Sequence, residues 1–128
     1  MSAGFRPVLT DIAETWARCR RWILPALADC QGTYSEDDIV RGLFDGRYFI
    51  VAGDRCAGIA HIDRFPRLTV LHVFLAGGDL AELKQMEAAI ARQAKAAGIG
   101  RIEISGRRGW LRALPGYREL CTTVIKDL

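Results

Sequence analysis

The run Leu68–Leu75 is almost wholly apolar, a pattern typical of a central strand that is covered on both faces. A second strand is predicted at Arg101–Ser105, where isoleucines alternate with polar side chains. Between them lies the longest helical pattern of the chain, Leu80–Ala97. A strand, a crossing helix and a further strand in one sheet make a parallel pair. The chain is therefore predicted to be an α/β protein built around these two parallel strands.

The long helix carries signals at both of its ends. Asp79 and Glu82 match a capping box at its start, and Gly98 suits its C-terminal end. Apolar residues recur at spacings of three and four, which predicts one face against the sheet. The residues predicted on that face are Leu80, Leu83, Met86, Ile90 and Ala94.

Two more strands are predicted ahead of the apolar run, at Arg47–Ala52 and Arg55–Ile62. Gly53 and Asp54 between them suit a tight hairpin turn. The second of these strands returns into the apolar run through a turn around Pro66. Three consecutive antiparallel strands are therefore expected before the crossover.

Two helices are predicted before the hairpin. The first is expected to begin at Thr10 as its N-cap, and Pro25 is expected to kink it or end it near Leu24. The second is expected to begin at a capping box made by Ser35 and Asp38. The apolar residues of the first helix recur at spacings of three and four, which places them on one face of that helix.

Three short elements complete the predicted order: a first strand at Phe5–Leu9, a short helix at Gly106–Leu114 and a last strand at Cys121–Lys126. The full order is then β-α-α-β-β-β-α-β-α-β, which gives a mixed sheet. A length of 128 residues suits one domain with one core, so a single domain over residues 1–128 is predicted.

Composition narrows the class of function. Half of the residues are hydrophobic, and the formal net charge is only +3, so a dedicated nucleic-acid-binding protein is not expected. No apolar stretch reaches the length of a membrane span or matches a signal peptide. The four cysteines form no CxxC pair, which favours free thiols in a reducing compartment. We therefore expect a cytoplasmic protein that contacts no membrane.

The predicted order resembles the GNAT fold of acyl-CoA N-acyltransferases over nearly the whole chain. Val51–Gly58 is similar to the family's second hairpin, and Ala97–Ile102 is similar to its passage from the long helix into the fifth strand. Gly116 and Tyr117 stand where the family usually has Gly-Phe. Ser105–Trp110, together with the short Gly77-Gly78 loop, resembles small GNAT-like proteins of tailed phages and prophages.

The resemblance implies that backbone N–H groups before the long helix bind acetyl-CoA, here at Leu75, Ala76, Gly77 and Gly78. The family pattern in this loop is Gln/Arg-x-x-Gly-x-Gly/Ala. This loop is shorter, has no Arg or Gln, and places the Asp79 carboxylate where pyrophosphate would sit. Weak or absent binding of acetyl-CoA is therefore expected. The other interpretation is a plain strand-to-helix turn capped by Asp79.

The resemblance also implies a tyrosine, four residues before the Gly-Phe, that protonates the departing thiolate. Counting back from Gly116 gives Arg112, which cannot donate a proton at neutral pH but can stabilise a thiolate. Arg107 and Arg112 belong to an arginine-rich segment. It can hold the 3′-phosphate of CoA, a nucleic-acid backbone or an acidic protein surface, or simply form a solvated basic face.

Two histidines are candidates for a general base. If the turn centres on Pro66 and Arg67, pairing places His61 opposite His72 on one face of the sheet, with Asp63 nearby. Such a group can deprotonate an amine or form part of a metal site. It can equally be a hydrogen-bonded pair under a helix, and zinc is not expected without a third ligand at suitable spacing.

Glu103 is a second candidate base, because it points away from the isoleucine face toward the expected cleft between the parallel strands. The alternative for Glu103 is a solvated or ion-paired carboxylate. The leading functional prediction is a phage-type GNAT-like protein that transfers acetyl from acetyl-CoA to a small-molecule or protein amine.

The first alternative is a non-catalytic virion or assembly component that binds phage structural proteins. A phage-encoded protein would lie in the host cytoplasm or the virion. The weakest alternative is an accessory protein that binds nucleic acid through the arginine-rich segment.

Overall fold

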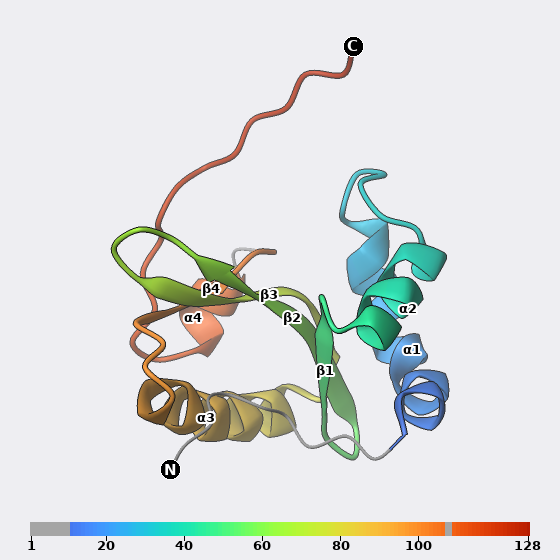
Figure 1. Cartoon of the computed structure of the whole chain (residues 1–128), viewed down its shortest axis with the longest axis horizontal. Helices are drawn as coiled ribbons and strands as arrows, with labels where there is room; N and C mark the ends of the chain where they lie inside the picture. Colours follow the sequence, from blue (N-terminus) through green and yellow to red (C-terminus); the bar gives the residue numbers. More distant parts are fainter. Residues whose placement is uncertain (1–10, 107–108) are drawn as a thin grey trace.

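The computed structural model describes residues 11–106 and 109–128. Four strands form one sheet in the order β1-β2-β3-β4 (Figure 1). Strands β1 (Phe49–Ala52) and β2 (Cys56–Arg64) are antiparallel, as are β2 and β3 (Thr69–Gly78). Strand β4 (Arg101–Ile104) runs parallel to β3. The predicted mixed sheet and its parallel pair are confirmed.

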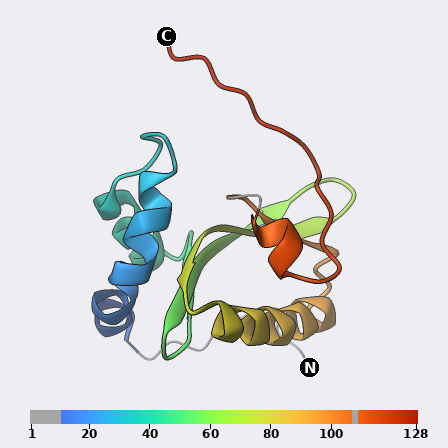
Figure 2. The same cartoon turned by 180° about the vertical axis from the view of Figure 1, so that it is seen from behind.

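Helices cover both faces of this sheet, so the molecule has three layers (Figures 1 and 2). Helix α3 (Leu80–Ala96) makes the crossover from β3 to β4, with the short α4 (Gly109–Ala113) beside it. Helices α1 (Ile12–Ala28) and α2 (Glu36–Asp45) pack on the opposite face. Among the described residues, no helix is long and apolar enough to cross a membrane.

Each face of the sheet has its own hydrophobic cluster. Ile23, Ile39 and Ile59 are fully buried between the sheet and helices α1 and α2. Leu71 and Ala94 form the centre of a smaller cluster between the sheet and α3. Burial of a large aliphatic side chain contributes about 1.5–3 kcal/mol, so the α1/α2 layer provides more of the stabilisation.

A β-bulge separates the two ends of β3. Ile59 pairs with Leu75, but the next residue of β2, Ala60, pairs with Val73. Phe74 is therefore the extra residue of the bulge. Phe74 and Leu75 both pack in the α1/α2 cluster, so the bulge switches which residues of β3 face each layer.

The starts of the first two helices are fixed by side-chain caps. Asp11, rather than the predicted Thr10, is the N-cap of α1, because its carboxylate accepts the Glu14 amide. The predicted capping box of Ser35 and Asp38 is confirmed in both directions. Helix α1 continues through Pro25 to Ala28, so the early stop predicted near Leu24 is wrong. Pro25 lies in the last turn, where the missing N–H removes only one hydrogen bond.

Two predictions fail at the ends of later elements. Residues 121–126 belong to no strand, and the exposed chain runs away from the body of the molecule (Figure 1). Four consecutive β-branched residues, 122–125, favour an extended backbone, but a strand also needs a paired neighbour, and the sheet ends at β4. Leu80, predicted to face inward, is 48% exposed because it begins the helix. The predicted strand Phe5–Leu9 lies outside the described residues.

Candidate functional site

His61 and His72 lie directly opposite each other on β2 and β3, as the sequence predicts. Their ring centroids are 5.0 Å apart in an edge-to-face arrangement. Phe74 packs against both rings, and Tyr48 packs against His61. The pair therefore lies on the α1/α2 face, at the margin of the aromatic part of that cluster.

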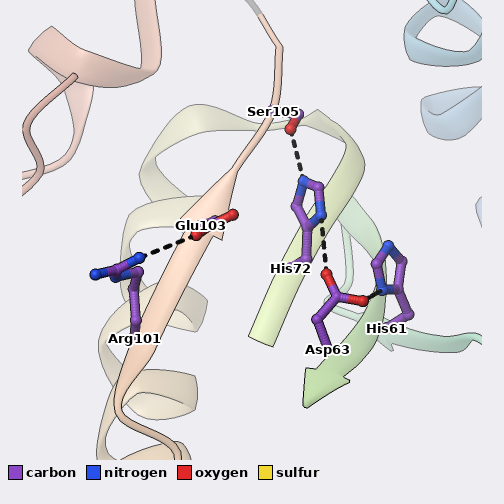
Figure 3. Close-up of polar contacts among 6 residues, drawn as sticks. All are labelled: His61, Asp63, His72, Arg101, Glu103 and Ser105. Carbon is purple, nitrogen blue, oxygen red and sulfur yellow. Dashed lines mark hydrogen bonds and ion pairs between the residues drawn. The ribbon is translucent and has the colours of Figure 1, made fainter. Parts of the chain in front are cut away.

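Asp63 joins the two histidines. It lies two residues after His61 on β2, so both side chains are on one face of the sheet. One carboxylate oxygen is 3.1 Å from His61 Nδ1, and the other is 3.6 Å from His72 Nδ1 (Figure 3). The three side chains are 23%, 34% and 22% exposed for His61, Asp63 and His72, so solvent reaches them only in part.

The far nitrogen of His72 contacts β4. His72 Nε2 is 2.6 Å from Ser105 Oγ (Figure 3). Ser105 follows the last residue of β4, and its backbone N–H donates to Val73 O at 3.0 Å. Burial, followed by the neighbouring His61, lowers the pKa of His72, while Glu103 and Asp63 act in the opposite direction. His72 is therefore mainly a neutral imidazole at pH 7.

Glu103 lies next to the histidine pair on the neighbouring strand, but it is not part of the contacts among His61, Asp63 and His72. It is the parallel-register partner of His72, and its carboxylate contacts Arg101 at 3.4 Å (Figure 3). Among the described residues, Glu103 makes no hydrogen bond or ion pair with either imidazole, although its charge acts on His72. The structure therefore places Glu103 in the ion-paired arrangement that was the alternative to a base.

The predicted cofactor loop is part of a strand. Leu75, Ala76, Gly77 and Gly78 pair with residues 56–59 of β2, and only Asp79 separates them from α3. Gly77 lies against the backbone of α1, since a Cβ at this position would be 2.2 Å from the carbonyl oxygen of Trp22. The four residues thus form a continuous strand that leads directly into the helix.

Two carboxylates lie at the start of α3. Asp79 accepts the Glu82 amide at 2.9 Å, but the reciprocal half of the predicted capping box does not form. The Asp79 amide instead donates to the carbonyl of Arg55. Glu82 reaches across to the hairpin turn and accepts the amides of Asp54 and Arg55 at 3.1 and 2.7 Å.

Cys56 completes this group of contacts. A hydrogen bond from its thiol and then the Arg55 amide lower the pKa of Glu82. Burial, followed by Glu82, raises the pKa of Cys56 to about 12. Cys56 is therefore an inert, protonated thiol, and Glu82 is ionised at neutral pH.

The opposite face of the parallel pair holds a small apolar cavity of about 50 Å³ between the sheet, α3 and α4. Val73, Ile104 and Trp110 are among its lining residues, and Tyr117 and Glu87 are its polar members. Tyr117 donates its hydroxyl hydrogen to Glu87 at 2.8 Å. Burial, followed by Glu87, raises the pKa of Tyr117. Sequence reasoning treated Tyr117 only as the counterpart of the family's Phe, because nothing in the sequence pairs it with Glu87.

Of the two arginines predicted at the cofactor site, the structure describes only Arg112. Arg112 lies in the last turn of α4 with an exposed side chain. Arg107 lies outside the described residues. Arg112 makes no contact with the strand Leu75–Gly78 among the interactions that the structure describes.

The histidine cluster also meets the geometric requirement of a metal site. His61, Asp63 and His72 each offer one ligand atom within 4.8 Å of the others. Asp63, which the sequence analysis places beside the histidine pair, is the third residue of this group. The Asp63 carboxylate already contacts both imidazoles without an ion. The absence of zinc stays a prediction.

Comparison with known proteins shows the fold. No protein-family model matches the chain, and no curated protein matches it. The crystal structure of wild-type TTHA1254 from Thermus thermophilus is 18% identical, with a TM-score of 0.58 over 96% of this chain and 98% of that one. The aminoglycoside acetyltransferase meta-AAC0020, from an uncultured soil metagenomic sample and in complex with sisomicin, is 9% identical. Its TM-score is 0.62 over 92% of this chain and 90% of that one.

These two similarities extend over almost the full length of both neighbours, so the chain has a GNAT-like α/β fold that it shares with an acetyltransferase. Identities this low establish the fold alone. Neither neighbour is described as a phage protein. The narrower resemblance to phage proteins therefore rests on Ser105–Trp110 and Gly77-Gly78 only.

Proposed function

We propose that this protein is an acyl-CoA-dependent N-acyltransferase with weak cofactor binding and slow turnover. The proposal rests mainly on one observation. The candidate base and the apolar cavity both lie at the position where the pairing of β3 with β4 ends. The two strands pair only up to Val73 and Ile104, while β3 continues to Gly78. Beyond Val73, no strand lies beside β3 on the β4 side among the described residues.

At this position the two faces of the sheet carry different kinds of side chain. His72 precedes Val73 and faces the α1/α2 side, while Val73 lines the cavity on the α3/α4 side. A thioester held between the parted strands would be open to an amine from the histidine side. Its pantetheine arm could use the exposed edge of β3 and the apolar cavity wall. The arrangement supports acyl transfer by direct attack, with His61 and His72 taking the proton of the amine.

An amine acceptor also fits the charge of this face. Asp63 and Glu103 are carboxylates beside the histidines, and an ammonium ion is attracted to such groups before it loses its proton. The soil acetyltransferase was crystallised with an aminoglycoside, which is a polyamine. We propose a small polycationic amine as the acceptor class.

Weak cofactor binding is supported by the start of α3. Helix N-termini bind pyrophosphate through unpaired N–H groups and the helix dipole. Here the Asp79 carboxylate already caps the Glu82 amide, and Glu82 adds a second negative charge in the first turn. A like-charge contact a few ångströms from a phosphate costs on the order of a few kcal/mol near a protein surface. Each 1.4 kcal/mol is about tenfold in affinity, so the dissociation constant moves toward millimolar.

Slow turnover is supported because, among the described residues, no side chain is free to protonate the leaving thiolate. Arg112 stands where the resembling family has a tyrosine, and its side chain is exposed. Tyr117 lines the cavity, but its proton is donated to Glu87 and its pKa is raised. A phenol whose proton is held in this way is a poor general acid, so thiolate release relies on water.

The test is product formation from acetyl-CoA at several millimolar with a panel of amines, including sisomicin. Acetylated amine is detected by mass spectrometry, since Cys121 is an exposed thiol that would react with a thiol-detecting dye. We expect slow acetylation that falls at least about 100-fold when both histidines are replaced by glutamine. Thr122→Ala, on the exposed chain end, is the control. Acetylation that is unaffected by the histidine replacements would contradict the assigned base, and no acetylation of any amine would contradict the function.

A further inference from the structure

The contacts of Asp63 with the two imidazoles favour one position for the proton of each neutral ring. A carboxylate only accepts hydrogen bonds, so an imidazole nitrogen that contacts it carries the proton. Both Nδ1 atoms face the Asp63 carboxylate, which places the protons of neutral His61 and His72 on Nδ1. The lone pair of His72 then lies on Nε2. Its contact at 2.6 Å is the hydroxyl of Ser105, which donates to Nε2 in this tautomer.

We propose that Ser105, His72 and Asp63 form a nucleophilic triad, in which Ser105 Oγ attacks activated acyl donors and becomes acylated. The order of contacts, from serine oxygen to imidazole Nε2 and from imidazole Nδ1 to carboxylate, is the one that activates a serine hydroxyl (Figure 3). This reactivity is distinct from direct transfer to an amine and does not require CoA to bind.

Three further features support a reactive serine at this position. Ser105 is exposed, so a substrate can reach its oxygen. The next residue, Gly106, has a φ of +153°, and an added Cβ there would be 3.1 Å from the Trp110 ring. The backbone therefore turns at Gly106, next to the Trp110 ring and directly after Ser105. His61 Nδ1 contacts the other oxygen of Asp63 at 3.1 Å. This contact orients the carboxylate so that its remaining oxygen faces His72.

The burial of His72 favours the same role. A lowered pKa keeps this imidazole neutral at pH 7, as a general base requires. The Nδ1 contact of 3.6 Å is longer than a strong hydrogen bond. Such contacts commonly tighten when charge develops on the imidazole during reaction.

The reaction balances without a further reactant. As the Ser105 Oγ–carbonyl bond forms, the hydroxyl proton moves to His72 Nε2, and the bond from the carbonyl carbon to the thiolate or phenolate breaks. The imidazolium then returns its proton to the leaving group. Water or an amine, activated by the same imidazole, releases the acyl group from Ser105.

The experiment uses a phosphonofluoridate probe on the full chain, because the probe forms a stable serine–phosphorus bond with loss of fluoride. Intact mass gives the rate, and peptide mapping locates the adduct. We expect one adduct at Ser105, none in Ser105→Ala, and a rate at least about 100-fold lower in His72→Gln. Thr122→Ala removes another exposed hydroxyl and should react as the wild type does. Unchanged melting temperatures show that each variant is folded.

An adduct elsewhere in the chain, or equal rates for the wild type and Ser105→Ala, would overturn the triad. A rate unaffected by His72→Gln would also overturn it, because the serine would then be merely exposed. Chelator is present throughout, so an ion bound by the histidines cannot suppress the reaction. Since the probe contains no CoA and no amine, its result is independent of whether acetyl transfer is observed.

Discussion

Replacing Gly77 by alanine tests whether this glycine is required for packing. The added Cβ would lie 2.2 Å from the carbonyl oxygen of Trp22 and 3.2 Å from its carbonyl carbon, whereas ordinary contact begins at 3.4 Å. Both atoms belong to the backbone of α1, so no side chain can swing aside. Helix α1 must move away from β3 by about 1 Å, in a layer that contains the larger buried cluster.

The magnitude follows from what overpacking costs. A shift of this kind destabilises by about 1–3 kcal/mol, and 1 kcal/mol lowers the melting temperature of a domain of this size by roughly 3–5 °C. We expect Gly77→Ala to melt about 3–15 °C below the wild type in thermal unfolding followed by circular dichroism. Gly58→Ala is the matched control on the neighbouring strand, since its Cβ would meet nothing closer than 3.5 Å.

We expect Gly58→Ala to melt within about 2 °C of the wild type, because alanine there gains ordinary contacts and restricts the unfolded chain. A melting temperature of Gly77→Ala equal to that of the wild type would refute the packing explanation.

Three further outcomes are expected. Glu82→Gln should lower the midpoint of urea unfolding, because two hairpin amides lose a charged acceptor; an unchanged midpoint would contradict this. The pKa of His72 is lowered on folding, so its contribution to stability is complete above the unfolded pKa near 6.5 and is lost as pH falls below it. The charged and titratable groups facing His72 are His61, Asp63 and Glu103. The melting temperature should fall below pH 6.5 more steeply in the wild type than in His72→Gln, and parallel curves would argue against the shift. Deletion of residues 119–128 should change the free energy of unfolding by less than about 0.5 kcal/mol, since all of them are exposed; a larger loss would mean that they pack on the body.

The sequence was sufficient to predict the histidine pair because one turn determines its register. The turn around Pro66 and Arg67 sets which residues of β2 and β3 face each other. The bulge at Phe74 lies beyond His72 and so does not alter that register. A bulge placed a few residues earlier would have separated the two rings, and no feature of the sequence located it.

Contacts between distant segments could not be predicted in the same way. Ser105 meets His72 only because of the parallel register of β3 and β4, which a long helical crossover does not determine. Tyr117 meets Glu87 across the cavity for a similar reason. Glu82 matched a capping box in sequence, yet the approach of the hairpin turn to α3 offered it two better donors.

Calorimetric titration with acetyl-CoA tests the central claim most directly, namely an acyltransferase fold whose cofactor site is weakened by carboxylates at the start of α3. We expect measurable binding with a dissociation constant of roughly 0.1–5 mM, about 100- to 5,000-fold weaker than a cofactor site with a dissociation constant of 1 μM. Asp79→Asn keeps a helix cap while removing one negative charge, and we expect it to bind more tightly than the wild type. A low-micromolar dissociation constant for the wild type would contradict the weakened site. No heat at any accessible concentration of acetyl-CoA would contradict the acyltransferase function itself.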